Sequence, residues 1–211
     1  MMMKKLFSIL VLLLLFQSAY AQKQQYKVGA VGFYNFENLF DLEDHPEKKD
    51  EDFTPTGSYR YTEKIYNEKL GHLSSVVSEL AIDLTPDGLA ILGVAEIENR
   101  KVLEDFVLQP KIKDRHYQII HYESPDFRGI DVALLYNPKY FLPTSSEAIV
   151  LPIYNDDGTN KATRDILYVS GSFDGEPLHI LVNHWPSRRG GAEATAKFRN
   201  AGAAVCKNII D

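Results

Sequence analysis

The chain has 211 residues, a formal net charge of −6 and one cysteine, Cys206. A single cysteine excludes an intrachain disulfide, and a net negative charge argues against general binding of nucleic acid, which depends on clustered Lys and Arg. A phosphate ligand would therefore have to be bound by a local basic patch or through a metal ion.

Residues 1–21 have the pattern of a secretory signal peptide. A basic start is followed by an apolar run from Leu6 to Phe16, and Ala19-Tyr20-Ala21 supplies the small residues of a cleavage site. The run is shorter than the ~20 residues of a membrane-spanning helix, so a membrane anchor is the less favoured alternative. We expect residues 22–211, with a net charge of −8 after two lysines are removed, to form one exported domain, periplasmic or extracellular.

The first part of this domain alternates strands and helices. The first expected strand ends on Asn35-Phe36-Glu37-Asn38, and the second ends on Glu96. Asn99 follows closely and is expected to cap the second helix. The expected elements are strands over 27–34 and 89–95, helices over 61–80 and 100–108, and a long exposed acidic loop over 41–58.

The second part consists mainly of short apolar runs with turn residues between them, which is typical of strands. Asp174-Gly175-Glu176-Pro177 indicates a tight connection between two antiparallel strands. The expected strands are 116–122, 130–136, 141–150, 165–173 and 178–183, and the expected helix is 192–210. We therefore expect a mixed α/β (α+β) domain with about two packed sheets.

Carboxylate and amide groups at two strand ends are candidate metal ligands. Asn35 and Glu37 are two residues apart and would share a face of an extended strand, although polar residues at a strand end also serve turns. Glu96 ends an apolar strand, where a carboxylate is unfavourable unless it is paired or metal-bound. Such oxygen ligands favour Mg²⁺, Mn²⁺ or Ca²⁺. The alternative of a solvated acid capping the next helix fits Glu98 better than Glu96.

Basic and imidazole groups at two further positions are candidates for phosphate binding. His184 follows an apolar strand and is flanked by Asn183, Arg188 and Arg189, so it could donate to a phosphate oxygen or act as a general acid. A structural histidine is the alternative. Arg128 could present a planar fork to a phosphate, or could pair with a neighbouring aspartate. The other five histidines are interpreted as surface or packing residues: His45, His72, His116, His121 and His179.

Four segments together resemble the endonuclease/exonuclease/phosphatase superfamily, the DNase I-like hydrolases. They occur in the family's order and span nearly all of residues 22–211. The segments are 34–41 (YNFENLFD), 93–99 (GVAEIEN), 128–136 (RGIDVALLY) and 182–188 (VNHWPSR). The resemblance implies a four-layered α/β sandwich, in which two packed mixed β-sheets are flanked by helices.

The resemblance also implies roles for the candidate residues and a divalent cofactor. Mg²⁺ is the expected ion, with Mn²⁺ and Ca²⁺ as alternatives. His184 looks like the histidine that contacts the scissile phosphate, and Arg128 like a phosphate-positioning residue. We expect a catalytic set of His184, Asn183 and Arg128 and a metal set of Asn35, Glu96 and Glu37.

The sequence departs from the family in lacking two of its later patterns, a Gly-Asp-x-Asn strand end and a Ser-Asp-His close. In the family these supply the carboxylate that activates water and an acid–base histidine partner. We therefore expect a truncated member whose C-terminal part is missing, with exposed apolar sheet surface and weak or absent activity.

The sequence thus predicts an exported, metal-dependent phosphodiester hydrolase, most similar to an endonuclease, that is monomeric and has no stable membrane association. Nucleic acid or another phosphodiester is the expected substrate. A phosphatase or a phospholipid headgroup hydrolase is the alternative, because the core motifs do not select a substrate. A secreted binding module would explain Tyr34, Phe36 and Trp185 as a ligand platform, but it leaves Glu96 and His184 unexplained.

Overall fold

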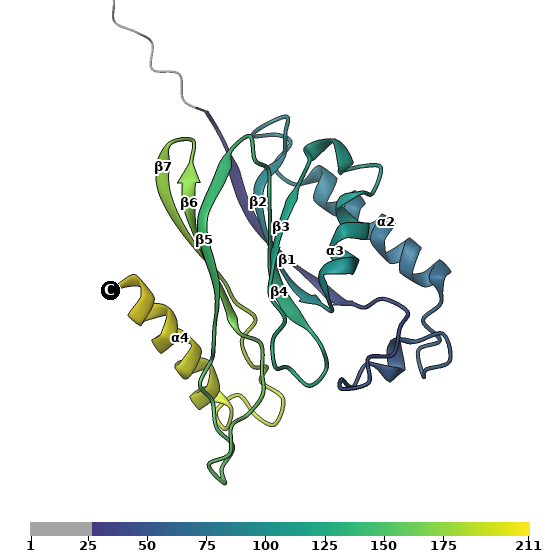
Figure 1. Ribbon diagram of the computed structural model, residues 1–211, viewed down its shortest axis with the longest axis vertical. Coiled ribbons are helices and arrows are strands. Elements are labelled where there is room, and N and C mark those ends of the chain that lie inside the picture. The colour runs from purple at the N-terminus through teal and green to yellow at the C-terminus, as the bar shows by residue number, and fades with distance from the viewer. Residues whose placement is uncertain (1–26) are drawn as a thin grey trace, which may run out of the picture.

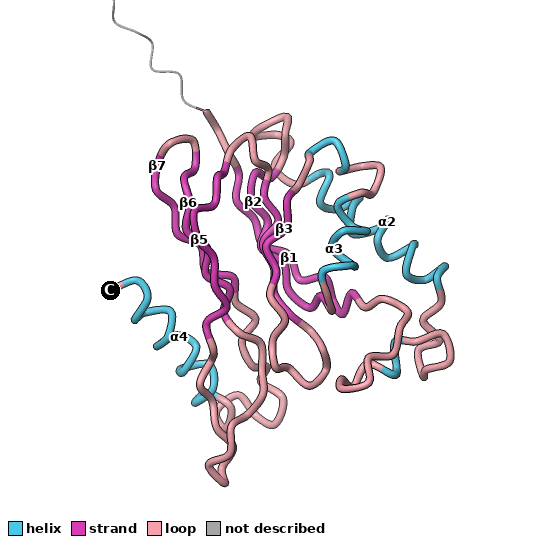
Figure 2. The backbone as a smooth tube through the Cα atoms, in the orientation of Figure 1, coloured by secondary structure: helices cyan, strands magenta, loops and turns pink. Residues whose placement is uncertain are grey.

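A computed structural model describes residues 27–211, so the expected signal peptide over 1–21 lies outside the described residues. Two β-sheets pack face to face, and helices lie on both outer sides (Figure 1). The tube view separates the resulting four layers, with α2 and α3 on one side and α4 on the other (Figure 2). In chain order the elements are β1 Ala30–Leu39, η1 Glu51–Phe53, α2 Glu63–Glu79, β2 Leu89–Ile97, α3 Arg100–Val107, η2 Lys113–Arg115, β3 Gln118–His121, β4 Asp131–Tyr136, β5 Phe141–Ile149, β6 Ile166–Phe173, β7 Glu176–Val182 and α4 Ala196–Ile210.

The first sheet has the strand order β1-β2-β4-β3. β1 runs parallel to β2, whereas β4 is antiparallel to both of its neighbours. Every residue of β2 is buried except Glu96. This strand is apolar throughout because helices cover one of its faces and the second sheet covers the other. A strand of this kind places its first polar residue at its end, where the packing layers stop.

Two separate hydrophobic cores hold the layers together. The first lies between the first sheet and the helices α2 and α3, where Phe36 packs edge-on against Phe106 with ring centroids 4.7 Å apart. The second lies between the two sheets and joins Ile91, Leu134 and Val169. Such burial supplies most of the driving force for folding, and the described chain needs no disulfide for it.

The second sheet is antiparallel throughout, in the order β5-β6-β7. β6 and β7 are joined by a tight turn in which Asp174 and Gly175 have φ of +50° and +96°. Two consecutive residues with positive φ form the turn type that matches strand twist in a hairpin, which confirms the tight connection expected at 174–177.

The edge strand β1 is only partly covered. Its residues Ala30 and Tyr34 contact the core on the helix side, but Val31 and Phe33 are 58% and 55% exposed. Side chains alternate along a strand, so these two face the side of the second sheet. The three strands of that sheet pack against β2 and β4 and leave β1 open on this face.

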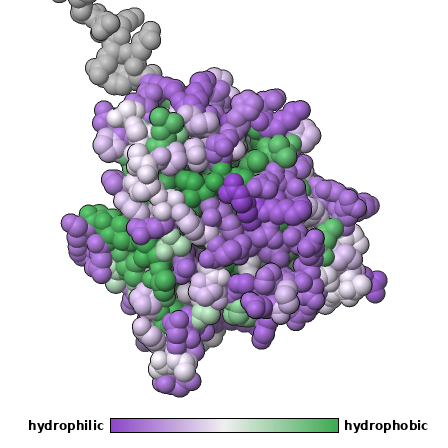
Figure 3. Space-filling model, viewed as in Figure 1, coloured by the Kyte–Doolittle hydropathy of each residue, from purple (hydrophilic) through white to green (hydrophobic). Residues whose placement is uncertain are grey.

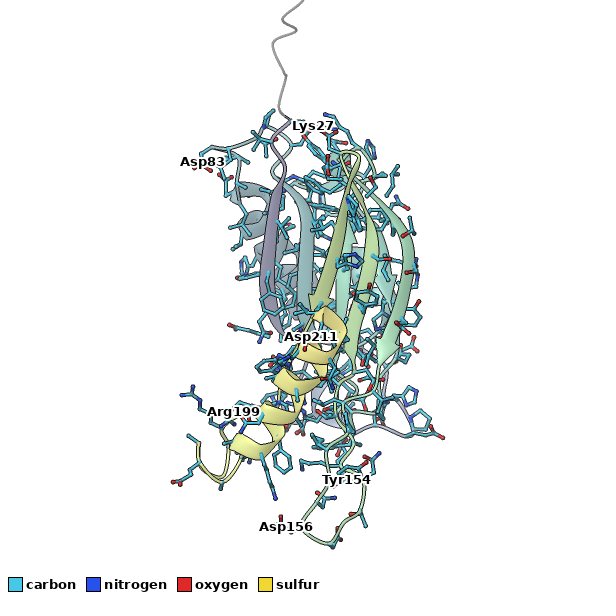
Figure 4. The ribbon with its side chains drawn as sticks, turned by 90° about the vertical axis from the view of Figure 1, so that its left-hand side faces the viewer. Lys27, Asp83, Tyr154, Asp156, Arg199 and Asp211 are labelled. Carbon is cyan, nitrogen blue, oxygen red and sulfur yellow. The ribbon has the colours of Figure 1, made fainter. Side chains whose placement is uncertain are left out.

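The last helix, α4, is held loosely. Its only buried residue is Gly202, and apolar side chains appear on the surface over α4, at the lower left of Figure 3. In the turned view the helix crosses the outer side of the second sheet from Arg199 toward Asp211 (Figure 4). A Cβ atom at Gly202 would lie 2.9 Å from Trp185 Nε1, so α4 approaches the His184 segment closely at this one point.

Most expected elements are confirmed, including the helix over 61–80 and the Asn99 cap, whose side chain accepts a hydrogen bond from Val102 N at 3.1 Å. The loop over 41–58 is mostly exposed, as expected, but two of its residues connect it to the core. Asp50 is 1% exposed, and the ring of Phe53 stacks on Phe40 with centroids 4.1 Å apart, which ties the loop to the core. Within residues 27–211, no helix has both the length and the apolar character needed to cross a membrane.

Candidate functional site

The ends of β2 and β7 meet at one edge of the sandwich. Glu96 Oε1 lies 3.2 Å from His184 Nε2, although the two residues are far apart in the sequence. Asn35 of β1 pairs with Ala95, the residue before Glu96, and its side chain helps to lower the pKa of the Glu96 carboxyl. β1 and β2 are parallel, so their carboxyl ends lie at the same edge. The Asn35 amide, the Glu96 carboxylate and the His184 imidazole therefore lie near one another at this edge.

A local irregularity of β2 aims Glu96 at this edge. The pairing of β2 with β4 shifts between Ala95 and Ile97, and Glu96 has a φ of +58°. This bulge breaks the side-chain alternation of the strand and turns the carboxylate toward the sheet end. A left-handed conformation is unfavourable for a residue with a side chain, and such strained residues are found most often at functional sites.

The neighbours of Glu96 keep it ionised. The hydrogen bond from His184 is the main cause that lowers its pKa, from 4.5 to about 2. Burial acts in the opposite direction, and Asn35 and the positive charge of Arg128 add to the lowering. A carboxylate that is held deprotonated and 18% exposed is available to a cation at neutral pH.

Asn35 is oriented by a tight turn inside β1, where the pairing with β2 shifts between Asn35 and Leu39. Its Oδ1 accepts a hydrogen bond from Glu37 N at 2.8 Å, and Glu37 and Asn38 have φ of +54° and +61°. Lys69 of α2 stabilises this turn, because its Nζ donates to the carbonyl oxygens of both residues, at 2.5 and 2.9 Å. Burial lowers the pKa of Lys69, and the charges of Glu37 and Glu96 oppose that lowering.

The same turn separates Glu37 from the other candidates. The premise that Asn35 and Glu37 share a face of an extended strand is wrong, because the backbone at Glu37 is left-handed. Glu37 is exposed and lines a separate pocket of about 300 Å³ beside α2, together with Lys69 and His72. Asn35 also borders that pocket, whereas Glu96 and His184 border the main cavity.

A buried arginine holds the backbone of the His184 segment. Arg164, which is 7% exposed, donates from Nε and Nη2 to the carbonyl oxygen of His184, at 3.1 and 2.8 Å, and from Nη2 to that of Trp185 at 3.2 Å. Its Nη1 donates to Asp126 Oδ2 at 2.9 Å. One guanidinium thus joins the strand that carries the imidazole to the loop before β4. Sequence reasoning missed Arg164, since no local pattern marks it.

Asp126 also orients Arg128. The backbone N–H of Arg128 donates to Asp126 Oδ1 at 2.9 Å, and its Nε lies 3.5 Å from the same oxygen. The ion pair of Arg128 with Asp126, which would compete with phosphate binding, is therefore present. Its N–O distance is long, however, and the Arg128 side chain is 40% exposed. Arg128 borders the cavity, where it can still turn a planar fork toward an anion.

Asn183 lies beside the site and has structural partners. Its Oδ1 accepts hydrogen bonds from Trp185 Nε1 at 2.9 Å and from Cys206 Sγ of α4 at 3.3 Å, and its Nδ2 donates to Leu181 O. The amide therefore connects β7 to the indole and to α4. Asn183 does not border the main cavity.

A cavity of about 670 Å³ opens beside Glu96 and His184. Four cationic side chains of the described residues border it: Arg128, Lys161, Arg164 and Arg189. Of these, Arg164 is already bonded to Asp126 and to two backbone carbonyls. Among the described residues only two carboxylates border it, Glu96 and Asp126, and Asp126 is already paired with arginines. The cavity is therefore suited to an anionic ligand despite the negative charge of the whole chain.

The donor groups of the site fit a divalent cation. The ionised carboxylate of Glu96 and the amide oxygen of Asn35 are hard oxygen ligands, and Mg²⁺ commonly takes one or two protein ligands and keeps several waters. A second group that could hold a metal ion consists of His121, Glu123 and Asp131, whose ligand atoms lie within 4.8 Å of one another. There, however, Asp131 already accepts from His121 Nε2 at 3.1 Å and from Ser124 N at 2.9 Å.

Comparison with known proteins places the chain in a family. Crystal structures of TDP2 from Caenorhabditis elegans share 18% identity with it; one covers 68% of this chain and 38% of that chain with a TM-score of 0.45. A truncated form covers 70% and 51%, with a TM-score of 0.44. The chain thus spans about half or less of these structures, and no curated protein matched it. The family model for the endonuclease/exonuclease/phosphatase family matches residues 30–211, and the chain belongs to that family.

Proposed function

We propose that the protein is a metal-dependent hydrolase that acts on phosphodiesters, most similar to an endonuclease. The observation that carries the proposal is the contact of Glu96 with both His184 and Asn35 beside a cavity with a cationic wall. Family membership supports hydrolysis of a phosphoester, and the donor groups support a divalent ion, with Mg²⁺ favoured.

Each residue of the site has a distinct role in this proposal. Glu96 and Asn35 would hold the divalent cation, which when bound supplies Lewis acidity toward a phosphoryl oxygen. His184 donates a hydrogen bond to a non-bridging phosphate oxygen, and Arg164 keeps the imidazole in place through the backbone. Arg128 binds and positions the phosphate, since its fork remains partly exposed.

Activation of the attacking water is the weak part of this site. Glu96 is assigned to the cation, and Asp126 is held by Arg164 at 2.9 Å, so neither cavity carboxylate is free to act as a general base. We therefore expect slow turnover from the described residues, with substrate and cation binding largely retained. Binding of the cation and the rate of hydrolysis should therefore be measured separately.

The proposal is tested with two substitutions at the site and one matched control. Glu96→Gln removes the charge without changing the shape, and should abolish Mg²⁺ or Mn²⁺ binding measured by calorimetry. His184→Ala should keep cation binding but lower hydrolysis of nicked plasmid and of bis(p-nitrophenyl) phosphate by roughly 100-fold, as for loss of one transition-state donor. His179→Ala, at an exposed position of β7, should leave both unchanged.

Unchanged hydrolysis in both site variants, with folding confirmed by circular dichroism, would rule out the proposed site. If the parent protein binds the cation through Glu96 but shows no detectable turnover, the hydrolase part of the proposal is contradicted and only cation binding remains.

We propose in addition that the protein is exported. The basic start, the apolar run and the Ala19-Tyr20-Ala21 pattern of residues 1–21 support this. Mass spectrometry of the protein from a secreting host should give a mature chain that begins at Gln22. A full-length chain that remains in the cytosolic fraction would contradict export.

A further inference from the structure

We infer that Trp185 is a stacking platform for a planar nucleobase, so that the substrate of this site is a nucleotide ester in single-stranded form. The inference rests on the proposed function, because it places the base next to the phosphate bound by Arg128 and His184. It narrows the substrate class that the core motifs leave open.

The indole of Trp185 is fixed from three directions. Its Nε1 donates to Asn183 Oδ1 at 2.9 Å, and its backbone carbonyl accepts from Arg164 at 3.2 Å. On the side of α4 it contacts the backbone at Gly202, where even a Cβ atom would come within 2.9 Å. A ring held in this way is preorganised, so a ligand that stacks on it does not have to immobilise it.

Although it is fixed, Trp185 remains 37% exposed and borders the main cavity. The other two aromatic rings in the cavity wall already have a cation near them. Lys49 Nζ lies 5.6 Å from the ring centroid of Phe127, and Lys197 Nζ lies 5.1 Å from that of Phe198. Trp185, by contrast, has no aromatic ring or cation against it among the described residues.

The surroundings of Trp185 favour a nucleobase with attached phosphate. His184 precedes it in the chain, so a phosphate at the imidazole would carry its ester group to the neighbouring indole. Arg189 and Lys161 border the same cavity and can bind a second phosphate of a nucleotide. Any of the four bases can stack on an aromatic side chain. Stacking therefore suits a site whose other proposed contacts are to the phosphates of the ligand.

The cavity is less suited to a phospholipid. None of the described residues that line its wall is Leu, Ile, Val or Met, so an acyl chain would find only Ala162, Pro186 and the aromatic rings to pack against. The uncharged polar residues of that wall are Asn155, Asn160, Thr163, Ser187 and Thr195. A saccharide could use these groups, and it is therefore the competing ligand in the test.

Because Trp185 is the only tryptophan in the chain, its fluorescence reports directly on this site. The parent protein, with metal removed by chelation, is titrated with the dinucleotide thymidylyl-thymidine, with the uncharged-headgroup diester glycerophosphoglycerol and with inositol 1-phosphate. We expect saturable quenching by the dinucleotide alone. Absence of quenching by the dinucleotide, or equal quenching by the inositol phosphate, would overturn the inference.

Kinetics of two variants provide the second test. Trp185→Leu should raise the KM for the dinucleotide roughly 10-fold or more, the factor expected for loss of one base–aromatic stack, and leave kcat within about twofold. Trp185→Phe keeps a ring and should restore most of the loss. For glycerophosphoglycerol, which has neither a ring nor a cationic group, all three proteins should have the same KM.

These outcomes separate failure of the inference from failure of the proposed function. If both diesters are hydrolysed and Trp185→Leu changes their KM values equally, stacking is overturned and the hydrolase proposal remains intact. Dinucleotide quenching without any hydrolysis would support stacking and contradict the catalytic proposal.

Discussion

At the scale of single residues, two carboxylates at the end of β2 show how strongly local surroundings determine chemistry. Glu96 faces an imidazole and an arginine, which lower its pKa to about 2. Glu98, two residues later, is 7% exposed, and burial together with Asp41 and Asp50 raises its pKa to about 8. Glu96 is therefore charged at neutral pH, whereas Glu98 is largely protonated. The interpretation of Glu98 as a solvated acid is wrong.

The raised pKa of Glu98 gives a pH-dependent stability. The folded-state pKa of about 8 lies above the ordinary 4.5, so the stabilisation is complete below pH ~4.5 and is lost as the pH rises through 8. At about 1.4 kcal/mol per pKa unit, the free energy of unfolding should fall by a few kcal/mol over this window. Glu98→Gln keeps a neutral side chain that can donate to Asp50 Oδ1, a buried atom without a hydrogen-bond partner. Its stability should fall much less between pH 5 and 8.5 in urea titrations.

The control for this measurement is Glu104→Gln, because Glu104 is exposed and pairs with Arg100 on α3. Its pH profile should follow that of the parent protein. An identical fall in stability for Glu98→Gln and the parent would show that Glu98 does not hold a proton in the folded state.

The Arg164–Asp126 pair is the second residue-scale feature that can be tested. Both side chains are nearly fully buried, and removing Arg164 leaves the Asp126 carboxylate with only the longer contact to Arg128 at 3.5 Å. Arg164→Met should lower the free energy of unfolding by about 3–5 kcal/mol. Adding Asp126→Asn removes the stranded charge and should recover part of that loss. A loss below about 1 kcal/mol for the single variant would contradict a structural role for the pair.

At the scale of elements, two helical glycines give a matched comparison. Gly71 in α2 has no atom within 4 Å of an added Cβ, so Gly71→Ala should stabilise the protein by about 0.5–1 kcal/mol through helix propensity. Gly202→Ala in α4 places its Cβ 2.9 Å from Trp185 Nε1, and should lose that gain because the indole must move. Thermal unfolding measures the first effect, and a shifted tryptophan emission measures the second. Equal stabilisation by both changes, with unchanged emission, would show that α4 does not press on Trp185.

The elements themselves could be predicted well from the sequence, and the site could be predicted in part. Hydrophobic periodicity predicts most of the strands and helices to within a few residues. Glu96 and His184 stand at or just past strand ends, where a polar group is conspicuous, whereas Asn35 lies inside β1. The left-handed turn at Glu37 could not be predicted, since it lacks glycine and is held by Lys69 from a distant helix. Arg164 was missed for the same reason, because its partners lie 20 and 38 residues away in the chain.

At the scale of the whole molecule, the two sheets differ in width, and this leaves apolar surface open. The first sheet has four strands and the second has three. A Cβ atom at Gly93 would lie 3.3 Å from both Phe33 and Val182, so Phe33 sits at the boundary where the second sheet stops covering the first. This agrees with the expectation of exposed apolar sheet surface.

The open face of β1 should bind a hydrophobic dye. Val31 and Phe33 are 58% and 55% exposed, and they lie two residues apart on the same face of β1, so they form one apolar strip. The parent protein should therefore enhance the fluorescence of anilinonaphthalene sulfonate in its folded state. The double change Val31→Thr and Phe33→Thr should reduce this enhancement severalfold, and should leave the free energy of unfolding within about 1 kcal/mol because both side chains are already more than half exposed. Leu84→Thr is the control, since Leu84 is 64% exposed but lies on a loop outside the sheets, and it should leave dye binding unchanged. If the double variant binds as much dye as the parent, the dye site lies elsewhere, and the face of β1 is covered in solution.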